Sequence, residues 1–187
     1  MLKVVLPKGS LEKATLALFE AADLTVQRSS TVEYNASIDD PRIDEVRILR
    51  PQEIAGYVAD GLFDLGITGR DWIEETSSDV VSLGELQYSK ATSNPVRIIV
   101  AVPEDSPYQS VADLPSGVRV SSEYPEITKR FFAEKGVDAD IRLSYGATEF
   151  GGPVTRMTAE LHTSWGSRKF GSVGCGLPGA RLRVIDA

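Results

Sequence analysis

Residues 45–71 read EVRILRPQEIAGYVADGLFDLGITGRD, and this stretch decides the fold class. Its first five residues predict an apolar strand, which ends at Arg50-Pro51. Proline is well tolerated in the first turn of a helix, so a helix is expected to start there. A helix is predicted from Pro51 to Asp60-Gly61, and a further apolar strand from Phe63 to Thr68. A strand, a helix and a strand in this order predict a βαβ unit, and therefore α/β architecture with a mostly parallel, covered sheet.

The same alternation is found upstream of this unit. Leu2 to Leu6 predicts a buried strand, and apolar residues between Leu11 and Ala21 recur at helical spacing, with Ser10 as the N-cap. Residues 26–44 are polar and predict a weak strand and an exposed turn, with little chemistry that can be recognised.

Downstream, a second series of elements predicts a second lobe. The strands expected there lie at 80–86, 95–103, 118–121 and 141–143, and the helices at 72–75 and 127–135. We expect a first lobe over 1–94, an incomplete second lobe over 95–149, and an atypical glycine-rich tail over 150–187. Asn94-Pro95 is the predicted crossover.

Composition narrows the class of protein. The 187 residues are 42% hydrophobic, enough to fill a core, and 27 acidic against 20 basic side chains give a net charge of -7. This charge argues against non-specific binding to nucleic acid or to an anionic membrane. One cysteine and one histidine give neither an internal disulfide nor a zinc cluster. No apolar run suits export or a membrane span, so we expect a cytoplasmic location.

Ligands of open α/β sheets bind beyond the carboxyl ends of the strands. Lys8-Gly9-Ser10 joins such an end to a helix start, where N–H groups and an ammonium suit an anion. Taken alone, this loop is more typical of an ordinary turn with a surface lysine. Gly66 to Asp71 presents a hydroxyl, a guanidinium and a carboxylate together. Asp71 could align a ribose hydroxyl or a nucleobase amine, or it could cap the following helix.

Four ordered strings resemble the ATP phosphoribosyltransferase family over residues 1 to about 149. They are LPKGSL (6–11), LRPQEIAGYV (49–58), GLFDLGITGRD (61–71) and SEYP (122–125). The resemblance implies a two-lobed fold similar to type II periplasmic binding proteins. It also implies a glycosyltransferase that condenses ATP with 5-phosphoribosyl-1-pyrophosphate, in the presence of Mg²⁺, to N1-(5-phosphoribosyl)-ATP and pyrophosphate, the first step of histidine biosynthesis. The family forms homo-oligomers, in some cases with a regulatory subunit.

The resemblance also assigns roles to individual residues. Catalytic roles fall on Arg50 and Asp71. The residues implied in substrate binding are Lys8, Gly9, Ser10, Thr68, Gly69, Tyr124 and Glu149. Tyr124 matches an aromatic residue near the adenine, and no residue is implied as a metal ligand.

After Glu149 the sequence departs from the family pattern. The family's loop Asp/Glu-Thr-Gly-x-Thr-Leu, which holds the ribose 5-phosphate, does not follow. Residues 145–187 instead resemble a segment of the adenylate-forming acyl-CoA ligases, which predicts a hybrid with its junction in Tyr145–Glu149. We therefore expect ATP binding to survive and phosphoribosyl pyrophosphate binding to be weakened. A non-catalytic nucleotide or small-anion binding module of the same fold is the alternative.

Overall fold

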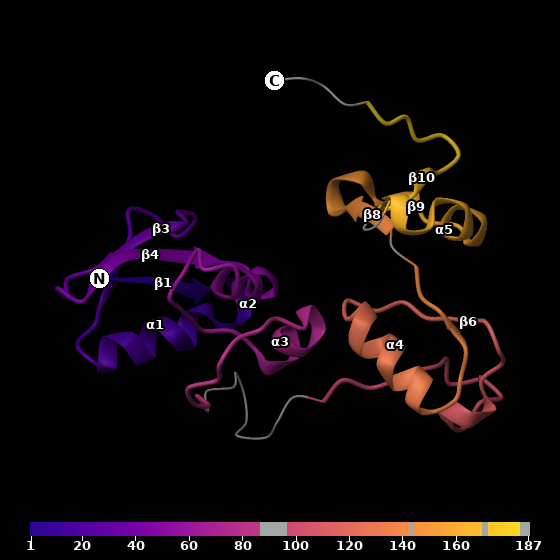
Figure 1. Cartoon of the computed structure of the whole chain (residues 1–187), viewed down its shortest axis with the longest axis horizontal. Coiled ribbons are helices and arrows are strands. Elements are labelled where there is room, and N and C mark those ends of the chain that lie inside the picture. The colour runs from indigo at the N-terminus through magenta and orange to yellow at the C-terminus, as the bar shows by residue number, and fades with distance from the viewer. Residues whose placement is uncertain (87–96, 143, 170–171, 184–187) are drawn as a thin grey trace. The chain divides into compact units, whose positions relative to one another are not determined.

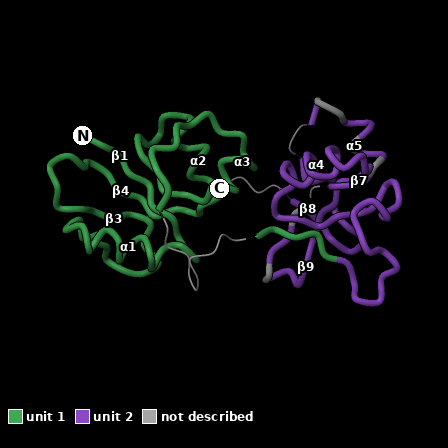
Figure 2. The backbone as a smooth tube through the Cα atoms, turned by 90° about the horizontal axis from the view of Figure 1, so that it is seen from below, with its two compact units in different colours: residues 1–101 green, residues 102–187 purple. Residues whose placement is uncertain are grey.

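The computed structural model describes residues 1–86, 97–142, 144–169 and 172–183. The chain divides into two compact units, Met1–Ala101 and Val102–Ala187 (Figure 2). The predicted crossover at Asn94-Pro95 lies outside the described residues. Each unit is described by itself below.

The first unit is built on a five-stranded sheet in the order β2-β3-β4-β1-β5 (Figure 1). Its strands are β1 (Leu2–Pro7), β2 (Val26–Gln27), β3 (Asn35–Ile38), β4 (Ile43–Leu49) and β5 (Leu65–Gly66). The central strand β1 pairs in parallel with both β4 and β5, whereas β3 pairs antiparallel with β4 and with β2. The predicted α/β class is therefore confirmed, and β4 and β5, the two strands of the predicted βαβ unit, both run parallel to β1, which lies between them. The mostly parallel sheet that the sequence predicts is instead mixed, with two parallel and two antiparallel pairings.

Helices cover both faces of this sheet. They are the 3-10 turn η1 (Gly9–Leu11), α1 (Glu12–Ala21), α2 (Pro51–Ala59) and α3 (Arg70–Thr76). Val4 and Leu6 point to one face, where they pack in one core cluster with Leu16 and Phe19 of α1. Successive strand residues point to opposite faces, and Val5 is fully buried on the other face beside residues of α2.

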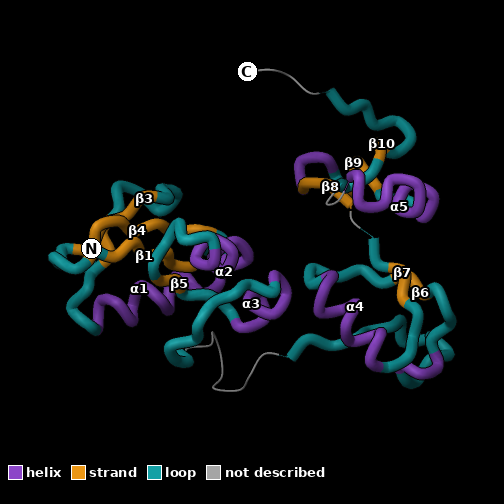
Figure 3. The backbone as a smooth tube through the Cα atoms, in the orientation of Figure 1, coloured by secondary structure: helices purple, strands orange, loops and turns teal. Residues whose placement is uncertain are grey.

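In its described residues the second unit contains two small sheets and two α-helices (Figure 3). Its first part comprises η2 (Val111–Asp113), β6 (Val118–Arg119), α4 (Pro125–Glu134) and β7 (Ala139–Asp140). Its second part comprises β8 (Ser144–Ala147), η3 (Thr148–Phe150), β9 (Gly152–Arg156), α5 (Ala159–Trp165), η4 (Gly166–Lys169) and β10 (Cys175–Gly176). β6 and β7 pair in parallel, while β8, β9 and β10 form an antiparallel sheet. No helix in the described parts of either unit is long and apolar enough to cross a bilayer.

Three local predictions are wrong, and a fourth is displaced, since the strand expected at 141–143 is β7, which ends at Asp140. Residues 80–86 and the described part of 95–103 are apolar but form no strand. Among the described residues no neighbouring strand pairs with their backbone, and Val81 and Ile99 are 84% and 77% exposed. Backbone N–H and C=O groups need such partners when a strand is buried. Ser10 is not an N-cap, because η1 precedes α1 and places Ser10 inside a 3-10 turn.

Candidate functional site

The carboxyl ends of β1, β4 and β5 meet at one edge of the first sheet, because the three strands are parallel. The Lys8 N–H donates to the carbonyl oxygen of Leu49 at 2.7 Å, and the Ile67 N–H donates to Val5 at 3.1 Å. The order β4-β1-β5 means that the chain leaves β1 toward one neighbour and later returns to its other side. This is a topological switch point, where open α/β sheets bind ligands.

Seven of the predicted site residues lie in the loops and first helical turns at this edge: Lys8, Gly9, Ser10, Arg50, Thr68, Gly69 and Asp71. Arg50 is exposed at the N-cap of α2. The hydroxyl of Thr68 donates to the carbonyl oxygen of Pro51 at 2.7 Å, so the loops after β4 and β5 are joined directly. The structure thus brings together side chains that are far apart in sequence.

Gly69 leaves room for the carboxylate of Asp71. α3 begins at Arg70 with Gly69 as its N-cap, so Asp71 lies in the first helical turn rather than at the cap. A Cβ built on Gly69 would lie 2.0 Å from Asp71 Oδ1. Any side chain at this position would therefore displace the carboxylate, which gives a physical reason for glycine there.

Lys8 is held by the segment before β3. Its ammonium lies 4.0 Å from the centroid of the Tyr34 ring, a cation–π contact, and Nζ donates to the carbonyl oxygen of Val32 at 3.4 Å. The Lys8 side chain is therefore oriented rather than free in solvent.

Gly9 adopts a left-handed backbone conformation with φ +80°, which glycine tolerates and other residues rarely adopt. Its N–H donates to Glu12 Oε2 at 3.1 Å, and Glu12 Oε1 accepts a hydrogen bond from Arg28. Burial raises the pKa of Glu12, but the hydrogen bonds from Arg28 and Gly9 together with the charges of Arg28 and Lys8 outweigh it and hold this pKa below its usual value. Glu12 therefore remains ionised at neutral pH.

The two remaining predicted residues belong to the second unit. Tyr124 is half-buried before α4, and its N–H donates to Ser122 Oγ at 2.9 Å. Its carbonyl oxygen accepts from the Thr128 N–H at 3.0 Å, which fixes the start of the helix. Glu149 is exposed in η3.

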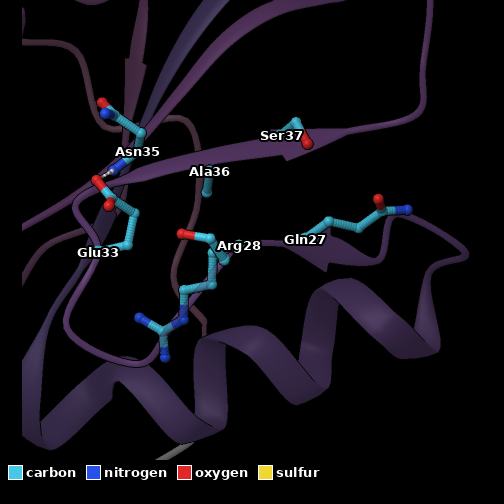
Figure 4. Close-up of a pocket in the computed structure, with 7 residues that line it drawn as sticks. Gln27, Arg28, Glu33, Asn35, Ala36 and Ser37 are labelled. Carbon is cyan, nitrogen blue, oxygen red and sulfur yellow. Dashed lines mark hydrogen bonds between the residues drawn. The ribbon is translucent and has the colours of Figure 1, made fainter.

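Two shallow hollows lie in the first unit. One, of about 410 Å³, is lined by Gln27, Arg28, Ser29, Glu33, Asn35, Ala36 and Ser37 (Figure 4). The other, of about 560 Å³, is lined by Gly9, Glu12, Lys13, Leu16, Ala17, Glu20 and Arg28. Arg28 lines both hollows, and Gly9 and Glu12 line the second.

Sequence reasoning missed Glu12, Arg28 and Tyr34. The signal for Glu12 was its spacing, since a carboxylate three residues after a helix-start N–H reaches back to it in a capping box. The stretch 26–44 was interpreted as carrying little chemistry, yet it supplies the partners of Lys8 and Glu12. Nothing local in that polar stretch marks these partners, because they depend on the pairing of β2 and β3.

Comparison with known proteins now identifies the class of this α/β protein. The family model described as ATP phosphoribosyltransferase matches residues 50–160. The chain is 43% identical to an ATP phosphoribosyltransferase of Koribacter versatilis over 99% of this chain and 60% of that protein. It is 49% identical to one of Chlorobaculum parvum over 80% of this chain and 50% of that protein. This chain belongs to the ATP phosphoribosyltransferase family.

The match differs in extent between relatives. The alignment with the Chlorobium phaeobacteroides protein, at 46% identity, covers 100% of this chain and therefore includes residues 150–187. The chain spans about 60% of the length of the relatives from K. versatilis and C. phaeobacteroides. The resemblance of the tail to acyl-CoA ligases stays a prediction.

A solved structure supports the fold. The ATP phosphoribosyl transferase (HisG:HisZ) complex from Thermotoga maritima matches with a TM-score of 0.51 and 21% identity, over 75% of this chain and 62% of that chain. At this identity the likeness concerns the fold alone.

Proposed function

We propose that this chain carries the nucleotide site and catalytic side chains of an ATP phosphoribosyltransferase. It condenses ATP with 5-phosphoribosyl-1-pyrophosphate to N1-(5-phosphoribosyl)-ATP and pyrophosphate, the first step of histidine biosynthesis. The observation that carries the proposal is the gathering of the loops after β1, β4 and β5 at one switch-point edge in a member of this family. Those loops hold Lys8, Arg50 and Asp71.

The reaction places defined demands on these side chains. Adenine N1 attacks the anomeric carbon of the ribose, the bond to pyrophosphate breaks, and positive charge develops on the sugar. Lys8 and Arg50 supply cations for the phosphates and the departing pyrophosphate. Asp71 orients a ribose hydroxyl, and its position depends on the space left by Gly69. The Thr68 hydroxyl holds the loop after β5 against the first turn of α2 through its hydrogen bond to the carbonyl oxygen of Pro51. Holding both reactants in attack geometry accounts for much of the acceleration.

Magnesium enters the proposal with the substrates. Among the described residues, no group of three or more His, Cys, Asp and Glu side chains gathers as a metal site. Mg²⁺ commonly binds through one or two carboxylates together with substrate phosphates. The phosphates of the two substrates would hold it, and it would neutralise part of their charge.

The finer fold, the partners and the location belong to the same proposal. The lobes predicted over 1–94 and 95–149 belong to a fold similar to type II periplasmic binding proteins, Tyr124 stacks on adenine, and Glu149 contacts substrate. The family resemblance supports these assignments, as it supports a cytoplasmic homo-oligomer, with or without a regulatory subunit. The solved neighbour is itself a two-component complex.

The test uses the full chain with Mg²⁺, ATP and phosphoribosyl pyrophosphate. Mass spectrometry follows N1-(5-phosphoribosyl)-ATP, and a pyrophosphate assay follows the second product. Lys8→Met and Asp71→Asn are expected to lower the yield, whereas Lys3→Met is the matched control, because Lys3 is exposed in the amino half of the same strand. ATP binding without product would favour the non-catalytic binding module, and absence of ATP binding would contradict both readings.

A further inference from the structure

We propose that Arg28 is a positioning residue, which acts through Glu12 to hold the backbone N–H of Gly9 in the loop that follows β1. This inference rests on the proposed function, in which that loop contacts the nucleotide. Two contacts carry it. Arg28 Nη2 donates to Glu12 Oε1, and Glu12 Oε2 accepts the Gly9 N–H at 3.1 Å. Each carboxylate oxygen thus serves one partner, and the carboxylate cannot shift without loosening both.

The hydrogen bond matters because packing does not restrain Gly9. A Cβ built on Gly9 would meet no atom within 4 Å, and the residue is exposed. Its left-handed backbone is therefore held in place by its hydrogen bonds rather than by neighbouring side chains. An ionised acceptor makes the stronger kind of hydrogen bond, and the contact with Arg28 lowers the pKa of Glu12.

The ion pair of Arg28 and Glu12 also connects distant parts of the first unit. Arg28 directly follows the edge strand β2, whereas Gly9 follows the central strand β1. Figure 4 shows the Arg28 side chain directed away from the strands toward the helix below them. Glu12, the first residue of α1, accepts the hydrogen bond from Arg28. The geometry of the central loop is thereby tied to the edge of the sheet.

Stability alone does not explain an arginine here. The Arg28 and Glu12 side chains are only 14% and 18% exposed, and Arg28 Nη1 is buried with no hydrogen-bond partner among the described residues. A buried ion pair adds little net stability, and a buried N–H without a partner costs free energy. Arg28 therefore acts through the position and the charge of Glu12.

Charge gives the second consequence of losing Arg28. Without its guanidinium, Glu12 becomes an uncompensated carboxylate beside a loop proposed to receive polyphosphate, with Lys8 as the other cation that acts on it. Arg28→Met is expected to weaken ATP binding about tenfold, the scale of one lost charge-assisted contact. Adding Glu12→Gln removes the excess charge and keeps an oxygen acceptor for the Gly9 N–H. The double variant is therefore expected to bind ATP better than Arg28→Met alone, and Arg28→Lys to lie between Arg28→Met and the unsubstituted chain.

The experiment combines calorimetric ATP titration with a pH titration of the Gly9 amide by NMR on the full chain. In the unsubstituted chain the amide should titrate below the usual glutamate range; in Arg28→Met the midpoint should rise, because burial then acts on Glu12 without its main partner. If Arg28→Met does not fold, Arg28→Lys, which keeps the cation, is measured in its place. Arg42→Met is the matched control, since Arg42 lies at the other end of β1, where its carbonyl oxygen accepts a hydrogen bond from the Leu2 N–H.

Two results would overturn the inference. One is a Gly9 titration that Arg28→Met, or Arg28→Lys in its place, leaves unchanged. The other is ATP binding that is lost in Arg28→Met and not improved by adding Glu12→Gln. If the unsubstituted chain binds no ATP, the proposed function fails, while the Gly9 titration still decides whether Arg28 positions the loop.

Discussion

The hydroxyl of Thr68 donates a hydrogen bond to the carbonyl oxygen of Pro51 over 2.7 Å, which joins the loop after β5 to the first turn of α2. Thr68→Val keeps the shape and removes the donor. We expect the free energy of unfolding to fall by about 1 kcal/mol, the net value of a typical hydrogen bond, and ATP binding to weaken as the loop loosens. Denaturant titration measures the first effect. Thr68→Ser keeps the hydroxyl and should retain most of the stability and most of the ATP binding. Equal losses in Thr68→Val and Thr68→Ser would show that the hydrogen bond contributes to neither.

Gly66 marks the closest approach of β5 to α2. A Cβ at Gly66 would lie 2.6 Å from Ile54 Cγ2, 3.0 Å from Val58 Cγ2 and 3.2 Å from Val5 Cγ1. Ile54 is fully buried and β-branched, so its methyl group has little room to move. Gly66→Ala should therefore lower the free energy of unfolding by about 1–3 kcal/mol, the usual cost of overpacking.

Gly56 provides the matched substitution for this test. It lies inside α2, and a Cβ there would meet nothing within 4 Å. Gly56→Ala should raise the free energy of unfolding by about 0.5–1 kcal/mol, because alanine is the better helix former. If Gly66→Ala and Gly56→Ala changed the free energy of unfolding in the same direction, the close packing of α2 on β5 would be contradicted.

Gly69→Ala tests the position of Asp71. The new Cβ would meet Asp71 Oδ1, the end of a short side chain that can rotate away, so unfolding should change little. The carboxylate would move, however, and product formation should fall. Gly84→Ala is the control, since a Cβ there meets nothing within 4 Å and the residue lies outside the three loops. Unaltered turnover in Gly69→Ala would remove Asp71 from the proposed mechanism.

Asp40 makes the stability of the fold depend on pH, independently of the candidate site. Hydrogen bonds from the Arg42 side chain and N–H lower the pKa of Asp40 from 3.8 to about 2. A lowered folded-state pKa stabilises the fold above the unfolded value, and this contribution is lost as the pH falls from 3.8 toward about 2. Arg42→Met should return the pKa toward its ordinary value, as followed by carboxyl NMR. A pKa that stays near 2 in this variant would show that the pairing is not the cause.

The sequence predicted the parallel part of the first unit well. The strand-helix-strand order around Arg50-Pro51 follows from local signals, and the three loops fall at one edge because parallel strands share a direction. Apolar runs at 80–86 and 95–103 misled the prediction, because hydrophobicity favours a strand only where a neighbour pairs with it. The contacts of Lys8 with Tyr34 and of Glu12 with Arg28 depend on tertiary structure, and no local pattern reveals them.

The central claim is that the loops after β1, β4 and β5 form the nucleotide site. The most direct measurement is the change in amide NMR shifts of the labelled full chain when ATP and Mg²⁺ are added. The account predicts the largest changes at Gly9, Thr68 and Gly69, with little change at Arg42, which lies at the opposite end of the strands. Saturable changes elsewhere with none in these three loops would contradict it.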